Sequence, residues 1–250
     1  MPNEKSSGGA AAHFYYTAAA ALMIAFAFAG FGPYYLHGTA FPGREVAPPM
    51  KTVVAVHAAA MTAWLVLSLV QPWLIAKGGK RAHMKVGKVG AALAALVFAF
   101  GLRVAVQSVR NTPPEALIWG LSPRQFMAVP FLSTVLFAAF VAAGIRFRFR
   151  PDLHRPMMLL ASLSAISAAV SRIDPLNALY HGTVAERWFG PFFLTLVVAV
   201  LLFAVRCALT RTFERPFAVG LGVLVAANAA VLRLAPTAAW ADFAAWATTG

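Results

Sequence analysis

Residues 52–76, TVVAVHAAAMTAWLVLSLVQPWLIA, decide the fold of this chain because they contain no Asp, Glu, Lys or Arg. A helix rises about 1.5 Å per residue, so this run is long enough to cross a hydrocarbon core of about 30 Å. Within it, alternating steps of four and three residues place five side chains on one helix face: His57, Met61, Trp64, Ser68 and Gln71. The stretch predicts a membrane span with one distinctive face.

Further apolar runs lie on both sides of this span. Residues 77–88, KGGKRAHMKVGK, hold five bases and no acid, and the apolar run that follows contains Arg103. We predict an all-α integral membrane bundle of seven transmembrane helices, at about 12–36, 52–76, 86–107, 125–146, 156–173, 188–210 and 216–235. Residues 10–236 form this single domain, residues 1–9 are predicted to be disordered, and residues 237–250 are predicted to be a tail in the membrane interface.

Two of the predicted spans have special features. Pro130 lies within the fourth span and predicts a kink, because proline cannot donate a backbone hydrogen bond. The fifth span is rich in Ser and Ala, and small residues let helix backbones approach closely. We therefore expect the fifth span to be central and tightly packed.

Composition excludes a soluble domain and disfavours nucleic-acid binding. Of the 250 residues, 60% are hydrophobic and 12% are charged, whereas soluble domains carry roughly a quarter charged residues. The net charge is +13, but the bases lie in short clusters between apolar runs, which favours anionic lipid headgroups as partners of the cytoplasmic loops. The single cysteine, Cys207, cannot form an intramolecular disulfide.

The distribution of bases predicts the orientation of the bundle. The loops at 77–88, 146–155 and 206–215 hold 12 bases, and Lys5 adds one more on the same side, against 8 on the opposite side. By the positive-inside rule, the N-terminus is cytoplasmic and the C-terminus is outside.

A weak internal repeat agrees with this arrangement of spans and basic loops. His154-Arg-Pro leads to Arg172, Glu214-Arg-Pro leads to Arg233, and His83-Met-Lys leads to Arg103. Each hairpin turns through bases and returns to an arginine at the outer face. Duplication explains this plan, and so does the ordinary flanking of short spans by snorkelling arginines.

The residues predicted to lie in the outer third of the bundle include several polar side chains. A polar ring at the depth of His57 is costly unless it faces the bundle interior, and the acid nearest the arginines in this region, Asp174, is a candidate counter-ion. One interpretation is an outward-opening polar pocket formed by His57, Arg103, Gln107, Arg172, Asp174 and Asn228. The other is a set of interfacial side chains that reach water together with one core histidine.

Sequence motifs of common enzymes are missing, so the function is predicted from the pocket. The chain has no His-Glu-x-x-His, no Walker loop, no Gly-x-Ser-x-Gly and no carboxylate pair inside a span. The first hypothesis is a non-enzymatic protein that binds or transports a small polar or anionic ligand from the outer side. The second is a redox protein that binds quinone or haem near His57, with His37 as a candidate second haem ligand. The third is a structural or accessory membrane subunit.

Two histidines of the basic loops form a separate candidate site. His83 and His154 occupy matching positions, and they approach one another if the two hairpins pack side by side. A shared metal or phosphate site is one interpretation, and ordinary loop residues are the other, because two histidines without a third ligand are a weak metal pattern.

The pattern of His57, Trp64, Gln71, a basic turn and then His83-Met-Lys-Val-Gly87 resembles one found in uncharacterised bacterial multispanning inner-membrane proteins of a domain-of-unknown-function type. The similarity covers residues 53–105, with an echo from Leu153-His-Arg-Pro to Arg172. This chain has Met84 where that pattern has arginine. The resemblance implies a location in the bacterial inner membrane and no particular activity.

Overall fold

The computed structural model describes residues 5–41 and 44–249, and nearly all of its elements are helices. The elements are α1 (Lys5–His37), β1 (Thr39–Phe41), β2 (Arg44–Glu45), α2 (Pro48–Ala76), α3 (Lys80–Arg110), α4 (Pro123–Phe126), α5 (Ala128–Arg146), α6 (Pro151–Val170), α7 (Asp174–Asn177), α8 (Val184–Phe189), the 3₁₀ turn η1 (Gly190–Phe192), α9 (Phe193–Thr210), α10 (Arg215–Leu234) and α11 (Ala238–Thr249). β1 and β2 pair antiparallel and form a short hairpin between α1 and α2.

Seven segments of the described chain are helical, long and apolar enough to cross a membrane, which confirms the predicted helical bundle at this level. They are Phe14–His37, Pro48–Ala76, Lys80–Arg110, Pro123–Arg146, Pro151–Val170, Val184–Thr210 and Arg215–Leu234. The fifth segment begins at Pro151 instead of residue 156, because Pro151 occupies the first turn, where its missing N–H costs nothing, and Asp152 follows it there.

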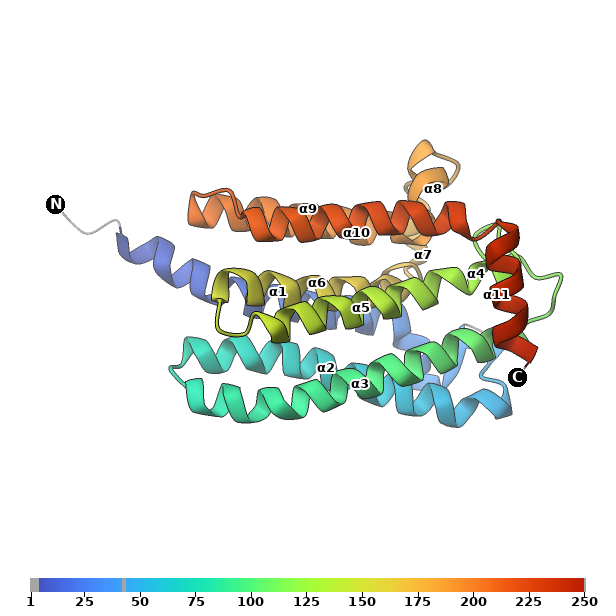
Figure 1. Ribbon diagram of the computed structural model, residues 1–250, viewed down its shortest axis with the longest axis horizontal. Helices are drawn as coiled ribbons and strands as arrows, with labels where there is room; N and C mark the ends of the chain where they lie inside the picture. Colours follow the sequence, from blue (N-terminus) through green and yellow to red (C-terminus); the bar gives the residue numbers. More distant parts are fainter. Residues whose placement is uncertain (1–4, 42–43, 250) are drawn as a thin grey trace.

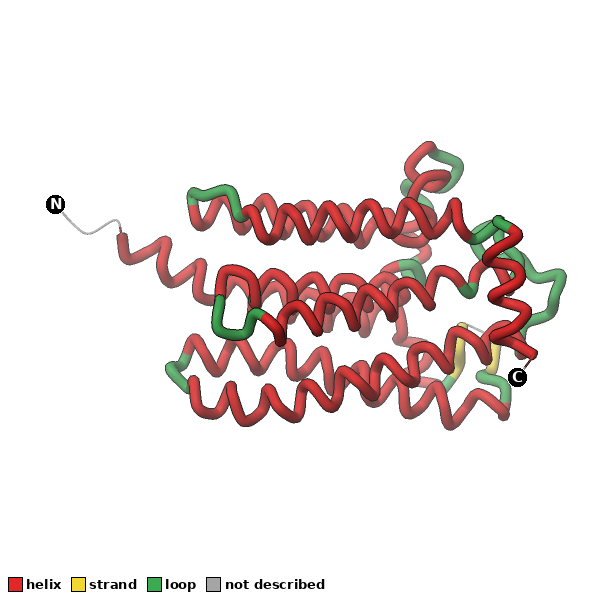
Figure 2. The backbone as a smooth tube through the Cα atoms, in the orientation of Figure 1, coloured by secondary structure: helices red, strands yellow, loops and turns green. Residues whose placement is uncertain are grey.

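The long helices run side by side, and the loops at 77–79, 147–150 and 211–214 lie at the same end of the molecule (Figure 1). We call one end the basic end, after its loops at 77–79, 147–150 and 211–214, and the other the α11 end. The described chain starts near the basic end and finishes at the α11 end, where α11 lies across the bundle. The β1–β2 hairpin and the short helices α4, α7 and α8 also lie at the α11 end (Figure 2).

Several predicted boundaries are corrected. The chain is helical from Lys5, so the disorder predicted for residues 1–9 does not hold from that residue onwards, and residues 1–4 lie outside the described part. The Ala10–Ala12 run extends the helix because alanine is the strongest helix former. Regular helix is interrupted between α4 and α5 at Met127, although the φ and ψ of Met127 stay helical. Pro130 lies three residues later in the first turn of α5, and the kink expected there stays a prediction. The sixth segment is broken at Gly190, whose φ is +45°.

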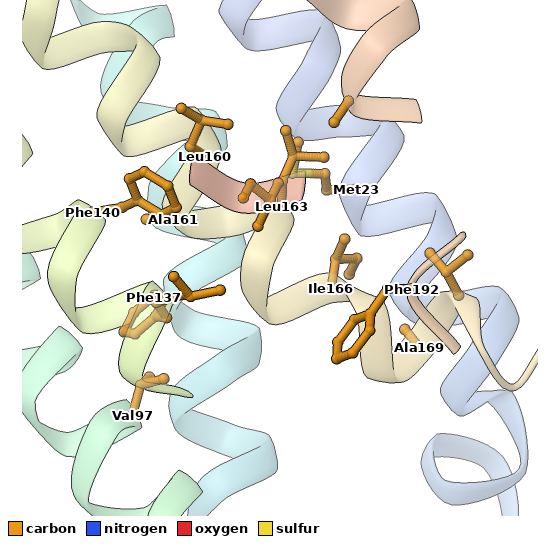
Figure 3. Close-up of a cluster of buried hydrophobic side chains, with 14 of the residues drawn as sticks. Met23, Val97, Phe137, Phe140, Leu160, Ala161, Leu163, Ile166, Ala169 and Phe192 are labelled. Atoms are coloured by element: carbon orange, nitrogen blue, oxygen red, sulfur yellow. The ribbon is translucent and has the colours of Figure 1, made fainter. Parts of the chain in front are cut away.

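The α6 helix is the centre of the bundle, as its small residues predicted. It packs on α1, α2, α5, α9 and α10, and most of its side chains are buried. Figure 3 shows Leu160, Leu163 and Ile166 between the aromatic side chains of α5 and Met23 of α1. The approach of α1 is closest at Gly30, where an added Cβ would lie 2.0 Å from the carbonyl oxygen of Ala169. Glycine is therefore required at residue 30.

Candidate functional site

A polar cleft opens at the α11 end between α1, the β1–β2 hairpin and the start of α2. Its volume is about 540 Å³, which falls in the range of sites for small molecules. The lining combines aromatic, hydroxyl and charged side chains with two small apolar ones: Tyr34, Tyr35, His37, Gly38, Thr39, Glu45, Val46, Lys51 and Ala55. The cleft therefore offers hydrogen-bond partners and both signs of charge to a ligand.

The end of α1 is shaped to form one wall of this cleft. The helix departs from α geometry at Phe31, contains Pro33, and stops at Gly38, whose φ is +69° and whose N–H donates to the Tyr34 carbonyl. A left-handed glycine directly after the last helical residue is a common helix stop. The chain then turns back, and Thr39 donates its hydroxyl hydrogen to the Pro33 carbonyl oxygen at 3.2 Å.

A hydrogen bond between α1 and α2 holds one aromatic side chain of the cleft, Tyr35. The Tyr35 and Thr62 hydroxyl oxygens are 2.8 Å apart, and the Thr62 hydroxyl also donates to the Ala58 carbonyl oxygen at 2.8 Å. Since the single Thr62 hydrogen is used there, Tyr35 is the donor to Thr62. The Tyr35 ring also stacks on Phe28, with centroids 5.3 Å apart. These contacts hold Tyr35 between α1 and α2.

Glu45 and Lys51 supply the charges of the cleft. Both side chains are exposed, and neither takes part in the ion pairs that the described residues form, which are Arg150–Asp152, His181–Glu186 and Arg206–Glu214. The carboxylate of Glu45 and the ammonium of Lys51 are thus available to a ligand that carries complementary groups.

His57, the deepest predicted site residue, faces the interface of three helices. An added Cβ on Gly101 of α3 would lie 3.4 Å from His57 Cε1 and 2.9 Å from the hydroxyl oxygen of Thr134 on α5. The Nδ1 atom of His57 is buried and has no hydrogen-bond partner among the described residues. His37, its proposed partner for haem, is exposed and lines the cleft instead. Haem ligation by these two histidines stays a prediction.

Arg103 and Gln107 follow Gly101 along α3. Two residues after Gly101 the helix has turned by about 200°, so Arg103 lies on nearly the opposite face from the His57 contact, and its side chain is exposed. The Gln107 side-chain oxygen is buried and has no hydrogen-bond partner in the part of the chain that the structure describes. The structure therefore does not bring Arg103 together with His57.

Arg172 and Asp174 follow the end of α6. The Arg172 guanidinium lies 4.8 Å from the centroid of the Phe31 ring on α1, and its Nη1 donates to the Ala168 carbonyl oxygen. Burial lowers the pKa of Arg172 to about 10, which leaves the side chain charged at neutral pH.

Asp174 is exposed at the start of α7 and lies outside the three ion pairs of the described residues. Its predicted role as counter-ion has no support in these contacts.

Asn228, the last predicted site residue, is buried in α10, which packs on α5, α6, α8 and α9. The predicted residues thus lie at several different places, namely the α2–α3–α5 interface, the exposed side of α3, the α6–α1 contact and the core face of α10. The spacing of residues along each helix did not reveal this, because it gives depth in the bundle and not the neighbour that a side chain faces.

His83 and His154 do approach one another at the basic end, as predicted. Their ring centroids are 6.2 Å apart and the rings are perpendicular. Each is the fourth residue of its helix, and each places Nδ1 near a backbone carbonyl oxygen of the preceding helix, at 3.3 Å from Gln71 and 2.8 Å from Gly144. Each histidine therefore joins the two helices of its own hairpin. The shared metal or phosphate site stays a prediction, since the described residues show no group of three or more metal-binding side chains.

The Gln71 side chain adds to this contact. When its amide is oriented to satisfy its neighbours, the oxygen accepts from the Gly87 N–H at 2.9 Å and the nitrogen donates to the His83 carbonyl oxygen at 3.3 Å. An added Cβ on Gly87 would lie 3.5 Å from this amide nitrogen, which is an ordinary van der Waals distance. The glutamine, histidine and glycine of the α2/α3 turn therefore form one packed unit.

Comparison of the chain with protein-family models, with curated proteins and with solved structures finds no match. The bacterial inner-membrane location implied by the resemblance in residues 53–105 therefore stays a prediction. The cleft is the best candidate site in the described part of the chain.

Proposed function

We propose that this protein binds a small zwitterionic solute from the outer side of a bacterial inner membrane. The observation that supports this proposal is the cleft of about 540 Å³ with Glu45 and Lys51 in its lining. A solute carboxylate pairs with Lys51, while a solute ammonium pairs with Glu45 and lies against the faces of Tyr34 and Tyr35. The sequence predicted a small polar or anionic ligand. The proposal made here is more specific, because the ligand carries a positive and a negative charge.

The proposed orientation places the basic end in the cytoplasm and the cleft outside. It rests on the excess of bases in the loops of the basic end, since such loops are retained on the cytoplasmic side. Membrane-impermeant labelling of a single cysteine, placed at Thr212 or at Thr237 in a Cys207→Ser background, tests it. Thr237 should react in intact cells and Thr212 only after lysis. The reverse result contradicts the orientation.

The binding experiment measures the thermal stability of purified protein in detergent with the amino acids, small dicarboxylates and small amines as probes. At least one amino acid should stabilise the protein more than the matching dicarboxylate or amine. Lys51→Gln and Glu45→Gln should each weaken its binding about tenfold or more, because each removes one charge-assisted hydrogen bond.

Lys77→Gln, which removes a base at the basic end, is the matched control and should leave this binding unchanged. The proposal fails if no probe stabilises the protein. It also fails if the two cleft variants bind the amino acid as well as the Lys77→Gln control does.

A further inference from the structure

An apolar groove lies beside α9 and reaches the α8 region of the α11 end. Its volume is about 300 Å³, and it is lined entirely by apolar side chains: Phe189, Phe193, Leu196, Val197, Val200, Leu201 and Val225. Phe193, Val197 and Val200 follow one face of α9, and the nine residues from Phe193 to Leu201 span about 12 Å of helix. The groove therefore runs beside about two turns of α9.

A cationic site lies at the α8 end of this groove. The Arg233 guanidinium carbon is 3.8 Å from the centroid of the Trp188 ring, and Trp188 directly precedes Phe189 of the groove. The neighbouring residue Leu232 packs against Gly190, where an added Cβ would lie 3.2 Å from its Cδ1 atom. The Arg233 end of α10 is thus fixed beside the first residues of the groove.

Arg233 retains donors for an anion. Its Nη1 donates to the Ala229 carbonyl oxygen at 2.9 Å, which uses one of the five guanidinium N–H groups. Arg233 and Arg187 are both exposed. The neighbouring acid, Glu186, is engaged by His181 at 2.7 Å and by the Gly182 N–H at 2.6 Å. Among the described residues, Glu186 forms no ion pair with Arg233 or Arg187.

From this arrangement we propose that the α9 groove binds one anionic phospholipid. The phosphate lies on Arg233 beside Trp188, and an acyl chain extends along Phe193, Val197 and Val200. Trp at the level of lipid headgroups and a basic side chain above an apolar groove between spans are the features that recognise such lipids. This site is separate from the cleft and does not depend on the proposed solute.

The test uses purified protein in dodecyl maltoside and native mass spectrometry of bound lipid. Phosphatidylglycerol should bind at least about fivefold more tightly than phosphatidylcholine with the same acyl chains, since one basic side chain contributes that much near a charged headgroup. Inorganic phosphate at the same concentration should not bind, because the acyl chain supplies much of the affinity. Equal binding of the two lipids, or binding of phosphate alone, overturns the proposal.

Two variants separate the headgroup contact from the groove. Arg233→Gln should reduce the affinity for phosphatidylglycerol about fivefold and leave that for phosphatidylcholine unchanged. Val200→Trp, at a side chain that is 48% exposed, should fill the groove and weaken binding of both lipids. Arg124→Gln removes another exposed arginine of the α11 end and should have no effect. A loss in Arg124→Gln equal to that in Arg233→Gln assigns the effect to general surface charge and overturns the site.

Discussion

The α5/α6 and α9/α10 hairpins carry related tripeptides at the basic end, yet they join their helices by different chemistry. In the first, His154 contacts the Gly144 carbonyl oxygen at 2.8 Å. In the second, Glu214 pairs with Arg206 at 3.1 Å, and the two side chains are 15% and 11% exposed. The tripeptide lies inside α6, because α6 starts at Pro151, but α10 starts at Arg215 within its own tripeptide.

The opposite ends of the same two hairpins are alike. Arg172 and Arg233 each donate to the carbonyl oxygen four residues earlier and stack on an aromatic ring, Phe31 or Trp188. The same arginine contact, with a carbonyl oxygen and an aromatic ring, therefore occurs at two different positions in the bundle. The contact at the turn, in contrast, differs between the two hairpins. The helix that follows the turn is the central α6 in one hairpin and α10, which is less buried, in the other.

We expect the largest loss of stability from a substitution at the contact between α1 and the central helix α6. Gly30→Ala places a Cβ 2.0 Å from a backbone oxygen of α6, which cannot move aside, so we expect a loss of about 3 kcal/mol of unfolding free energy. Gly220→Ala, where α10 meets α6, faces the Leu160 and Met157 side-chain ends at 2.3 and 2.9 Å and should cost less, because side chains can rotate.

Gly32→Ala and Gly222→Ala are the controls, since an added Cβ there has no described atom within 4 Å. Thermal unfolding in detergent measures all four variants. If Gly220→Ala costs as much as Gly30→Ala, the contact of α6 with α10 is as rigid as its contact with α1.

The second prediction contrasts the ion pairs of the two hairpins. Glu214→Gln leaves the Arg206 charge without its carboxylate in a largely buried place, and we expect a loss of about 2–3 kcal/mol. Asp152→Asn removes the acid of the Arg150–Asp152 pair, whose side chains are 64% and 55% exposed, and should cost about 0.5 kcal/mol or less. Chemical unfolding in mixed micelles gives both values. Similar losses for both variants would show that burial does not distinguish the two pairs.

The third prediction concerns the histidine of the α5/α6 turn. His154→Ala removes the hydrogen bond to Gly144 and should cost about 1–2 kcal/mol. Combined with Glu214→Gln, the losses should add to within about 0.5 kcal/mol, because no hydrogen bond or ion pair of the described residues joins His154 to Arg206 or Glu214. A coupling energy above about 1 kcal/mol would show that the hairpins act as one unit at the basic end.

The helical architecture could be predicted from the sequence. A chain that crosses hydrocarbon must satisfy its backbone hydrogen bonds internally, so each apolar run of sufficient length predicts a helix. The Ser and Ala content of residues 156–171 predicted the central position of α6, and the matching positions of His83 and His154 predicted their approach.

The candidate site was harder to predict. His57, Arg172 and Asn228 have suitable depths, but the structure turns them toward different neighbours. The cleft instead depends on how residues 38–41 and 44–51 pack over the end of α1, and the sequence indicated only a loop there.

The sequence by itself determined the number of apolar helices, their approximate ends and the loops that carry the bases, because each depends on local hydrophobicity and charge. Only the folded structure shows which helix faces which, that Glu45 and Lys51 line the same cleft, and that α6 begins at Pro151. Rotation about a helix axis is set by packing with residues far away in the chain, and a count of residues along one helix contains no information about those partners.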